Sequence, residues 1–148
     1  MDKDQFNKYL DLRYKKEINW YDKKAILNQR AYQVFQWVAI ILSAATPVLI
    51  VVGNGPVKWF AVAIAAVVAI STAALKTFKY QENWINYRTT CETLKKQYHF
   101  YEAGIQGYEN VNDREALFIE RVESLISREN TLWIVTHEKE ELPPKSPK

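Results

Sequence analysis

Apolar and polar residues divide the chain into an uncharged middle and two polar flanks. Between Arg30 and Lys76 the only charged residue is Lys58. Two apolar segments, joined by a Gly-Asn-Gly-Pro connection, occupy residues 37–52 and 59–75. About 20 apolar residues cross a bilayer core as a helix, and neither segment leaves a polar face for water. The pattern predicts a membrane hairpin with transmembrane helices at 36–52 and 57–75. The alternative is a helical hairpin buried inside a soluble bundle.

The flank before the hairpin carries a helical pattern that no glycine or proline interrupts. Residues 4–35 predict one long cytoplasmic helix, because apolar and aromatic positions recur every three or four residues. The face that they form consists of Phe6, Leu10, Tyr14, Ile18, Tyr21, Ala25, Asn28, Tyr32 and Phe35. We expect this face to pack on the chain's own C-terminal helix, since an apolar stripe on a helix is typical of a core contact.

The flank after the hairpin predicts two more helices. A stalk helix is expected over residues 76–103, where a pair of glycines ends it. A C-terminal helix is expected over residues 112–134, with Asn112 as its cap and Glu115 at the capping-box position. The charged and proline-rich tail, residues 137–148, is expected to be disordered.

The predicted fold is therefore all-α, a single domain over residues 1–136 built as a membrane hairpin with long cytoplasmic helical extensions. Cytoplasmic ends of membrane helices are enriched in Lys and Arg. One side of the hairpin carries Lys23, Lys24, Arg30, Lys76, Lys79 and Arg88, whereas the connection offers only Lys58. We expect a multi-pass protein of the cell membrane, with both termini cytoplasmic and with membrane lipid as a partner. The net charge of +3 is small for a nucleic-acid binder, so no nucleic-acid partner is expected.

Polar residues and a proline in the first apolar segment are the candidate functional positions. Pro47 cannot donate a hydrogen bond to the carbonyl of Ser43, so we expect a kink that could act as a hinge. Ser43, Thr46 and Ile50 share one helical face, which either lines a pore or closes contacts between helices. The mouths of such a pore would be ringed by Asn54 outside and by Gln33, Gln36, Lys76 and Glu82 inside.

The second apolar segment carries small residues at a four-residue interval. They are Ala61, Ala65, Ala69 and Ala73. Small residues at this spacing let two helix backbones approach closely. The expected partner is the first apolar segment, near Ala39, Ser43 and Ala44.

No arrangement of residues in the sequence indicates catalysis. His99 and His137 have no carboxylate or cysteine at a spacing typical of metal ligands. Cys91 is the only cysteine, which excludes an internal disulfide. Glu123 is expected on the solvated face of its helix, beside arginines of the same helix. We expect no enzyme activity, no metal site and no cofactor.

Three groups of residues resemble a known family in their order and spacing around the hairpin. Before it stand Tyr9-Leu10, Arg13-Tyr14 and Trp20-Tyr21-Asp22-Lys23-Lys24-Ala25. After it come Trp84, Tyr87-Arg88, Glu92-x-Leu94-Lys95 and Tyr98, and then Phe118-Ile119-Glu120-Arg121-Val122-Glu123 and Ser127-x-Glu129-Asn130-x-x-Trp133. Over residues 8–134 the chain resembles the bacterial SLATT-type two-transmembrane proteins and the closely related uncharacterised family DUF4231.

The resemblance implies a role rather than a catalytic site. SLATT-type proteins are regarded as membrane effectors of bacterial conflict systems, which oligomerise and open pores on a signal. The hypothesis for this chain is therefore an oligomeric, ion-permeable membrane pore gated from the cytoplasmic side. A sensor would have to be a separate cytoplasmic protein, because the chain carries no fused sensor domain. The alternative hypothesis is a non-conducting membrane anchor that recruits a soluble partner through its cytoplasmic helices.

Overall fold

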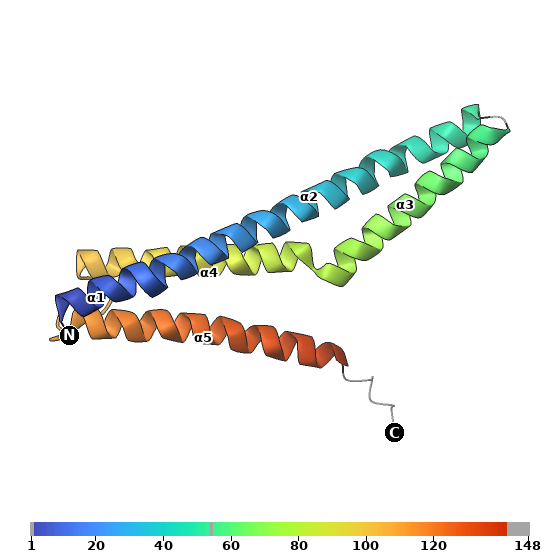
Figure 1. The fold of residues 1–148 in the computed structure, drawn as a ribbon. Coiled ribbons are helices and arrows are strands. Elements are labelled where there is room, and N and C mark those ends of the chain that lie inside the picture. The colour runs from blue at the N-terminus through green and yellow to red at the C-terminus, as the bar shows by residue number, and fades with distance from the viewer. Residues whose placement is uncertain (1, 54, 142–148) are drawn as a thin grey trace, which may run out of the picture. The chain divides into compact units, whose positions relative to one another are not determined.

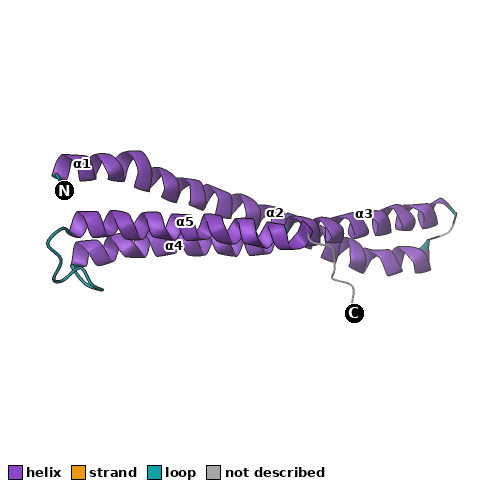
Figure 2. Ribbon diagram, turned by 90° about the horizontal axis from the view of Figure 1, so that it is seen from below, coloured by secondary structure: helices purple, strands orange, loops and turns teal. Residues whose placement is uncertain are grey.

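The computed structural model describes residues 2–53 and 55–141, and these residues are almost entirely helical (Figure 1 and Figure 2). The elements in chain order are α1 (Lys3–Tyr9), the π-helix η1 (Leu10–Tyr14), α2 (Lys15–Val52), α3 (Pro56–Phe78), α4 (Tyr80–Ala103) and α5 (Arg114–Glu141). No strand occurs among the described residues, and the all-α prediction is confirmed. The predicted outer-mouth residue Asn54 and residues 142–148 of the predicted tail lie outside the described part of the chain.

The chain divides into two compact units. The bundle unit comprises the described residues of 1–21 and 89–148, and the hairpin unit comprises residues 22–88. Helices α2 and α4 each contribute residues to both units. The sequence pattern does not anticipate this division, and the single domain over residues 1–136 stays a prediction.

An aromatic core closes the bundle unit. The ring centroid of Phe118 in α5 lies 5.7 Å from that of Phe6 in α1 and 5.3 Å from that of Tyr14 in η1. Tyr98 of α4 stacks on Tyr14 at 5.8 Å. Phe118 and Leu94 are fully buried. Phe6 and Tyr14 of the N-terminal apolar face thus pack on the C-terminal helix, as predicted, whereas Phe35 at the other end of the face stacks on Tyr80 of α4.

The π-helix η1 is a feature that the sequence pattern does not reveal. Lys15 donates its backbone N–H to the carbonyl of Leu10, five residues back, instead of four residues back. Buried side chains recur here at Phe6, Leu10 and Tyr14, at intervals of four residues. An α-helix has 3.6 residues per turn, so such positions drift around it. The wider π-turn keeps all three side chains on the core side.

The N-terminus of α5 differs from the prediction. Asp113, not Asn112, caps the helix, because its carboxylate accepts a hydrogen bond from the backbone N–H of Ala116 at 3.0 Å. Glu115 accepts the Tyr101 hydroxyl at 3.2 Å. The predicted capping box is therefore wrong. The helix also continues to Glu141, beyond the predicted end at residue 134, and its last five residues belong to the tail that was expected to be disordered.

The connection between the two apolar helices is shaped by glycine and proline. A Cβ added at Gly53 would clash with the carbonyl oxygen of Leu49, which accepts the Gly53 N–H at 3.0 Å. Gly55 has a φ of 57°, a conformation that glycine adopts at little cost. Pro56 then starts α3 at a position where its missing N–H needs no partner.

Helix α3 ends where the sequence pattern predicts a continuous stalk. Lys79 adopts the left-handed conformation with a φ of 47°, and α4 starts at Tyr80. The side-chain amide of Asn83 donates to the carbonyl of Phe78 at 3.1 Å and satisfies one of the groups that the helix end leaves open. The Tyr80 ring stacks on Phe35 of α2 at 5.8 Å. The predicted stalk over residues 76–103 is corrected to a break at Lys79 followed by α4.

The small residues of α3 do not form one inward face. Ala61 is 2% exposed and Ser71 is 4% exposed, so these two positions face the inside of the hairpin unit. Ala65, Ala69 and Ala73 are exposed. A strict four-residue interval drifts around a helix of 3.6 residues per turn, which carries the later alanines outward. On the first helix Ala39 is half-buried, but Ser43 and Ala44 are exposed, and that part of the predicted contact is wrong.

Candidate functional site

The hairpin unit presents an apolar surface that its own helices leave uncovered. Two helical stretches of the described chain, Lys3–Val51 (α1, η1 and α2) and Pro56–Ala103 (α3 and α4), each contain a window long and apolar enough to cross a membrane. The most apolar 18-residue window of the first has a mean hydropathy of 2.1 and no buried residue. That of the second has a mean hydropathy of 1.9, with 11% of its residues buried. The core helix of a soluble protein buries most of such a window, whereas both windows are largely exposed in this chain.

The exposed side chains are large and numerous. Val51 is 84% exposed, Trp59 is 76% exposed and Phe60 is 71% exposed. Ten more large apolar side chains between residues 34 and 70 are exposed: Val34, Trp37, Ile40, Ile41, Val48, Ile50, Val57, Val62, Val67 and Ile70. Removing such a side chain from water contributes about 1.5–3 kcal/mol when it becomes fully buried. If these side chains stayed in water, the chain would lack on the order of 15 kcal/mol of burial free energy even at half that value, which is as much as the whole stability of a domain.

The three predicted pore-lining residues do not lie in one environment. Ser43 is exposed, and Ile50 is 54% exposed, on the side of α2 that α3 leaves open. Thr46 is half-buried, and its hydroxyl donates to the carbonyl of Leu42 at 2.8 Å. Pro47 is exposed within an unbroken α2. Ser43 and Ile50 therefore remain available to line a pore, whereas the polar group of Thr46 is already satisfied by its own helix.

The predicted inner-mouth residues come from all three helical segments of the hairpin unit. Gln33 is exposed and Gln36 is half-buried on α2. Lys76 is exposed near the end of α3, and Glu82 is exposed in the first turn of α4. Their role in a pore stays a prediction, because it depends on neighbouring copies of the chain.

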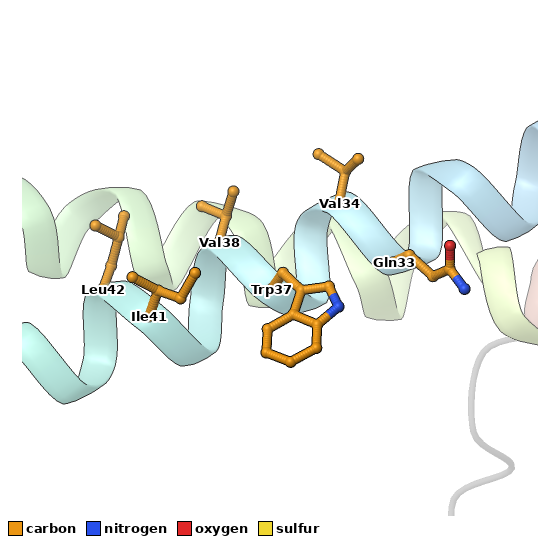
Figure 3. Close-up of a pocket in the computed structure, with 6 residues that line it drawn as sticks. All are labelled: Gln33, Val34, Trp37, Val38, Ile41 and Leu42. Atoms are coloured by element: carbon orange, nitrogen blue, oxygen red, sulfur yellow. The ribbon is translucent and has the colours of Figure 1, made fainter.

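A shallow groove of about 530 Å³ runs along α2 (Figure 3). Its lining is almost wholly apolar and comprises Gln33, Val34, Trp37, Val38, Ile41 and Leu42. Figure 3 shows all six side chains projecting from this one helix, with the Trp37 indole beside Gln33. Gln33 is the single polar residue of the lining and stands at the end of the groove nearer the N-terminus.

A charged cluster ties the N-terminal helices of the bundle unit to α5. Glu123 accepts the Tyr9 hydroxyl at 2.9 Å, and its two carboxylate oxygens each accept an N–H of Arg13 at 3.2 Å. A third N–H of Arg13 donates to Glu17 at 2.6 Å. The hydrogen bonds from Arg13 hold the pKa of Glu123 below its ordinary value, although partial burial opposes this. The expectation that Glu123 lies beside arginines of its own helix is wrong, because its partner comes from the other end of the chain.

A loop after α4 closes the end of this core. Tyr108 is fully buried, and the Arg121 guanidinium lies 4.7 Å above its ring. Arg121 also donates to the carbonyl of Gln106 at 2.8 Å. Burial raises the pKa of Tyr101, beside this loop, to about 12. Tyrosines with raised pKa values stay protonated near neutral pH, so this cluster holds the bundle together and supplies no base.

Four of the residues that carry the sequence resemblance make contacts that join helices of the bundle unit. Tyr9, Arg13 and Glu123 form the charged cluster, while Tyr14 donates its hydroxyl to the backbone carbonyl of Leu94 at 2.9 Å. Among the described residues no group of three or more His, Cys, Asp or Glu side chains could hold a metal ion.

The family model described as "Protein of unknown function (DUF4231)" matches residues 16–116, a range that contains the entire hairpin unit. No curated protein and no solved structure matches the chain.

Proposed function

The chain belongs to the family described as Protein of unknown function (DUF4231), and on that premise we propose that it is an oligomeric membrane protein that forms an ion-permeable pore gated from the cytoplasmic side. The predicted resemblance to this family is confirmed, whereas the resemblance to SLATT-type proteins stays a prediction. The family description names no activity, so the proposal rests on the surface and the charges of the hairpin unit.

Insertion into a bilayer is supported by the exposed apolar surface of α2 and α3. An 18-residue helical window is about 27 Å long at 1.5 Å per residue, close to the thickness of a hydrocarbon core. Backbone hydrogen bonds within a helix meet the requirement of a spanning segment, except that Pro47 leaves the carbonyl of Ser43 without its helical partner. Lipid would cover the large side chains that water solvates poorly.

The orientation follows from the positions of the basic residues. Lys23, Lys24 and Arg30 precede the first span, and Lys76 and Lys79 end the second. The connection offers one basic residue, so the excess lies on the side of the two termini. The positive-inside rule assigns that side to the cytoplasm.

Oligomerisation is needed because two helices cannot enclose a water path. The single observation that carries the pore is the exposure of Ser43 and Pro47 on a side of α2 that α3 leaves open. Gln36 lies on the same side, two helical turns nearer the N-terminus, and is half-buried. Several copies that turn this side toward a common axis would line it with a hydroxyl and, at the proline, with a carbonyl that has lost its helical partner.

Gating would act through helices that contribute residues to both units. Helix α2 runs without a break from Lys15 to Val52, and α4 runs from Tyr80 into the bundle core. A partner or ligand that repacks the bundle would therefore displace helices that continue into the hairpin unit. The sensor that supplies this signal would be a separate cytoplasmic protein.

Ion flux from liposomes tests the proposal. Purified protein should make vesicles permeable, and Ser43→Leu should reduce the flux because it replaces the exposed hydroxyl with a large apolar group. Thr46→Val is the matched control, since its hydroxyl bonds within α2 and its loss should leave the flux nearly unchanged. Vesicles that stay tight although the protein is inserted would contradict the pore.

The alternative function is a non-conducting anchor, and one observation favours it. The described part of the two spans holds no charged residue apart from Lys58, so no ring of charges would attract ions. If the hairpin only anchors, its replacement by an unrelated two-helix hairpin should preserve the activity of the protein in cells. Loss of activity on that replacement would favour the pore.

A further inference from the structure

One stripe along α2 changes from basic to apolar, and it belongs entirely to the hairpin unit. Its members recur at alternating intervals of three and four residues and therefore share one face of the helix. They are Lys23, Leu27, Arg30, Val34, Trp37 and Ile41. All six are exposed, and Leu27, Val34, Trp37 and Ile41 are exposed by 59–62%. The face offers positive charge at one end and a continuous apolar surface at the other.

The apolar end of the stripe coincides with the groove of Figure 3. Val34, Trp37 and Ile41 belong both to the stripe and to the lining of the groove. Arg30 precedes Val34 by one turn, a rise of about 6 Å along the helix axis. The volume of about 530 Å³ lies within the range of small-molecule sites. A ligand that fits this surface has one long apolar part and one anionic end.

The basic residues of the stripe are available to bind an anion. Within the described residues neither Lys23 nor Arg30 makes an ion pair or a side-chain hydrogen bond, and both are exposed. The nearest acidic neighbour in sequence, Asp22, already accepts a hydrogen bond from Arg88 at 3.3 Å. An external anion would therefore meet no competing carboxylate on this face of α2.

We propose that the stripe binds one anionic phospholipid of the cytoplasmic leaflet, with an acyl chain in the groove and the headgroup phosphate at Arg30 and Lys23. The inference rests on the bilayer insertion and orientation of the proposed function, but not on conduction. Trp37 lies in the apolar part of the stripe, two helical turns from Arg30, and an indole ring near the end of a span favours the membrane interface. Cytoplasmic leaflets are rich in anionic lipid, and each basic residue near their surface adds to the attraction.

A second copy of the chain is a poorer occupant of the same face. Membrane insertion in one orientation would make two α2 helices parallel. A symmetric contact along the stripe would then bring Arg30 against Arg30 and Lys23 against Lys23 at the same depth. Like charges at such positions oppose association, whereas a phosphate between them would neutralise both.

Quenching of Trp37 fluorescence by brominated lipids tests the inference. A variant that keeps Trp37 as its single tryptophan carries phenylalanine in place of Trp20, Trp59, Trp84 and Trp133. It is reconstituted in phosphatidylcholine vesicles with increasing fractions of brominated phosphatidylglycerol or brominated phosphatidylcholine. Its circular dichroism is compared with that of the parent chain. A second variant that keeps only Trp59, which is outside the stripe, reports insertion independently.

The brominated anionic lipid should half-quench Trp37 at a fraction at least fivefold lower than the brominated neutral lipid. Arg30→Gln should reduce that preference by about fivefold, since one basic residue near the surface adds roughly that factor. Lys58→Gln is the matched control, because Lys58 lies at the other end of the hairpin, and it should leave the preference unchanged. The Trp59 variant should show no preference between the two lipids.

Three other results would overturn the inference in distinguishable ways. Equal quenching of Trp37 by both lipids would show that ordinary bulk lipid covers the groove. Quenching of Trp59 without any quenching of Trp37 would show that protein, such as a second copy, occupies the face. Absence of quenching at both tryptophans would show that the hairpin is not inserted, and would overturn the proposed function as well.

Discussion

Replacement of Phe118 by alanine is expected to open the bundle unit. The side chain is fully buried in α5, and its ring lies within 6.0 Å of the rings of Phe6, Tyr14, Tyr98 and Tyr101. Loss of a buried phenylalanine costs about 3–5 kcal/mol, part of which is the cavity left behind. Four aromatic neighbours lose about 0.5–1.5 kcal/mol each in the most favourable geometries, so we expect the upper half of that range.

The single cysteine of the chain provides the assay. Cys91 is fully buried in the bundle unit, and its thiol lies 3.7 Å from the carbonyl oxygen of Ile18 in α2. Maleimide can react only when the unit opens, so the labelling rate in detergent reports the free energy of opening. A loss of about 4 kcal/mol should raise the labelling rate several hundredfold.

Leu12→Ala is the matched control for this experiment. Leu12 belongs to the same unit but is 53% exposed, and its truncation should change the labelling rate less than threefold. If Phe118→Ala labels no faster than the parent chain, the aromatic core does not hold α5 against the N-terminal helices. Equal acceleration by both substitutions would contradict the assignment of the core to the buried face.

Three further predictions follow from single features of the structure. Acid should weaken the bundle, because the stability that Glu123 gains from Arg13 is complete above the ordinary Glu pKa and is lost as the pH falls through its lowered pKa. Glu123→Gln should flatten the dependence of the free energy of unfolding on pH between pH 3 and 5, by no more than about 1 kcal/mol, since both side chains are over one-third exposed. A parent chain whose free energy of unfolding does not fall in this pH range would contradict the pairing. Alkali should also unfold it, because burial raises the pKa of Tyr101 to about 12. Above pH 10 the unfolded state ionises first, and stability falls by up to about 1.4 kcal/mol per pH unit for each such tyrosine. The tyrosinate absorbance of Tyr101, measured as the difference between the parent chain and Tyr101→Phe, should rise only as helix content is lost, and a rise at pH 10 before that loss would refute this. Lys79→Gly should stabilise the junction of α3 and α4 by about 0.5–1 kcal/mol, since Lys79 has a φ of 47°, and amide exchange at residues 78–83 that does not slow would argue against strain there.

The apolar hairpin and the N-terminal face could be predicted from the sequence because each depends on a strong periodic or compositional signal. Between Arg30 and Lys76 the chain has no charged residue apart from Lys58, and a stretch long enough for two membrane-spanning helices with so little charge predicts a pair of long apolar helices. The face that begins at Phe6 can be assigned to the core, because a stripe of large apolar side chains on a helix is normally covered by another part of the protein. Its partner, Phe118, follows from the same logic on α5.

Other features could not be predicted because they depend on contacts distant in sequence. The break at Lys79 has no glycine or proline to mark it; it involves stacking of Tyr80 on Phe35 and the bond from Asn83 to Phe78. The pairing of Glu123 with Arg13 joins opposite ends of the chain, so local spacing could not reveal it.

The candidate site was only partly accessible to sequence reasoning. A helical wheel places Ser43 and Thr46 on one face of the helix but cannot show which of them α3 covers. The structure separates the two, since Ser43 is exposed while the Thr46 hydroxyl bonds to Leu42. The exposure of the alanines after Ala61 likewise depends on how α3 packs, which the four-residue spacing alone does not determine.

Extraction of cell membranes with alkaline carbonate tests the central claim most directly, because it strips peripheral proteins and leaves spanning ones in place. The full chain should stay in the pelleted bilayer and be released only by detergent. Recovery of the folded protein in the carbonate supernatant would contradict it, since the surface around Val51, Trp59 and Phe60 would then be covered by something other than lipid.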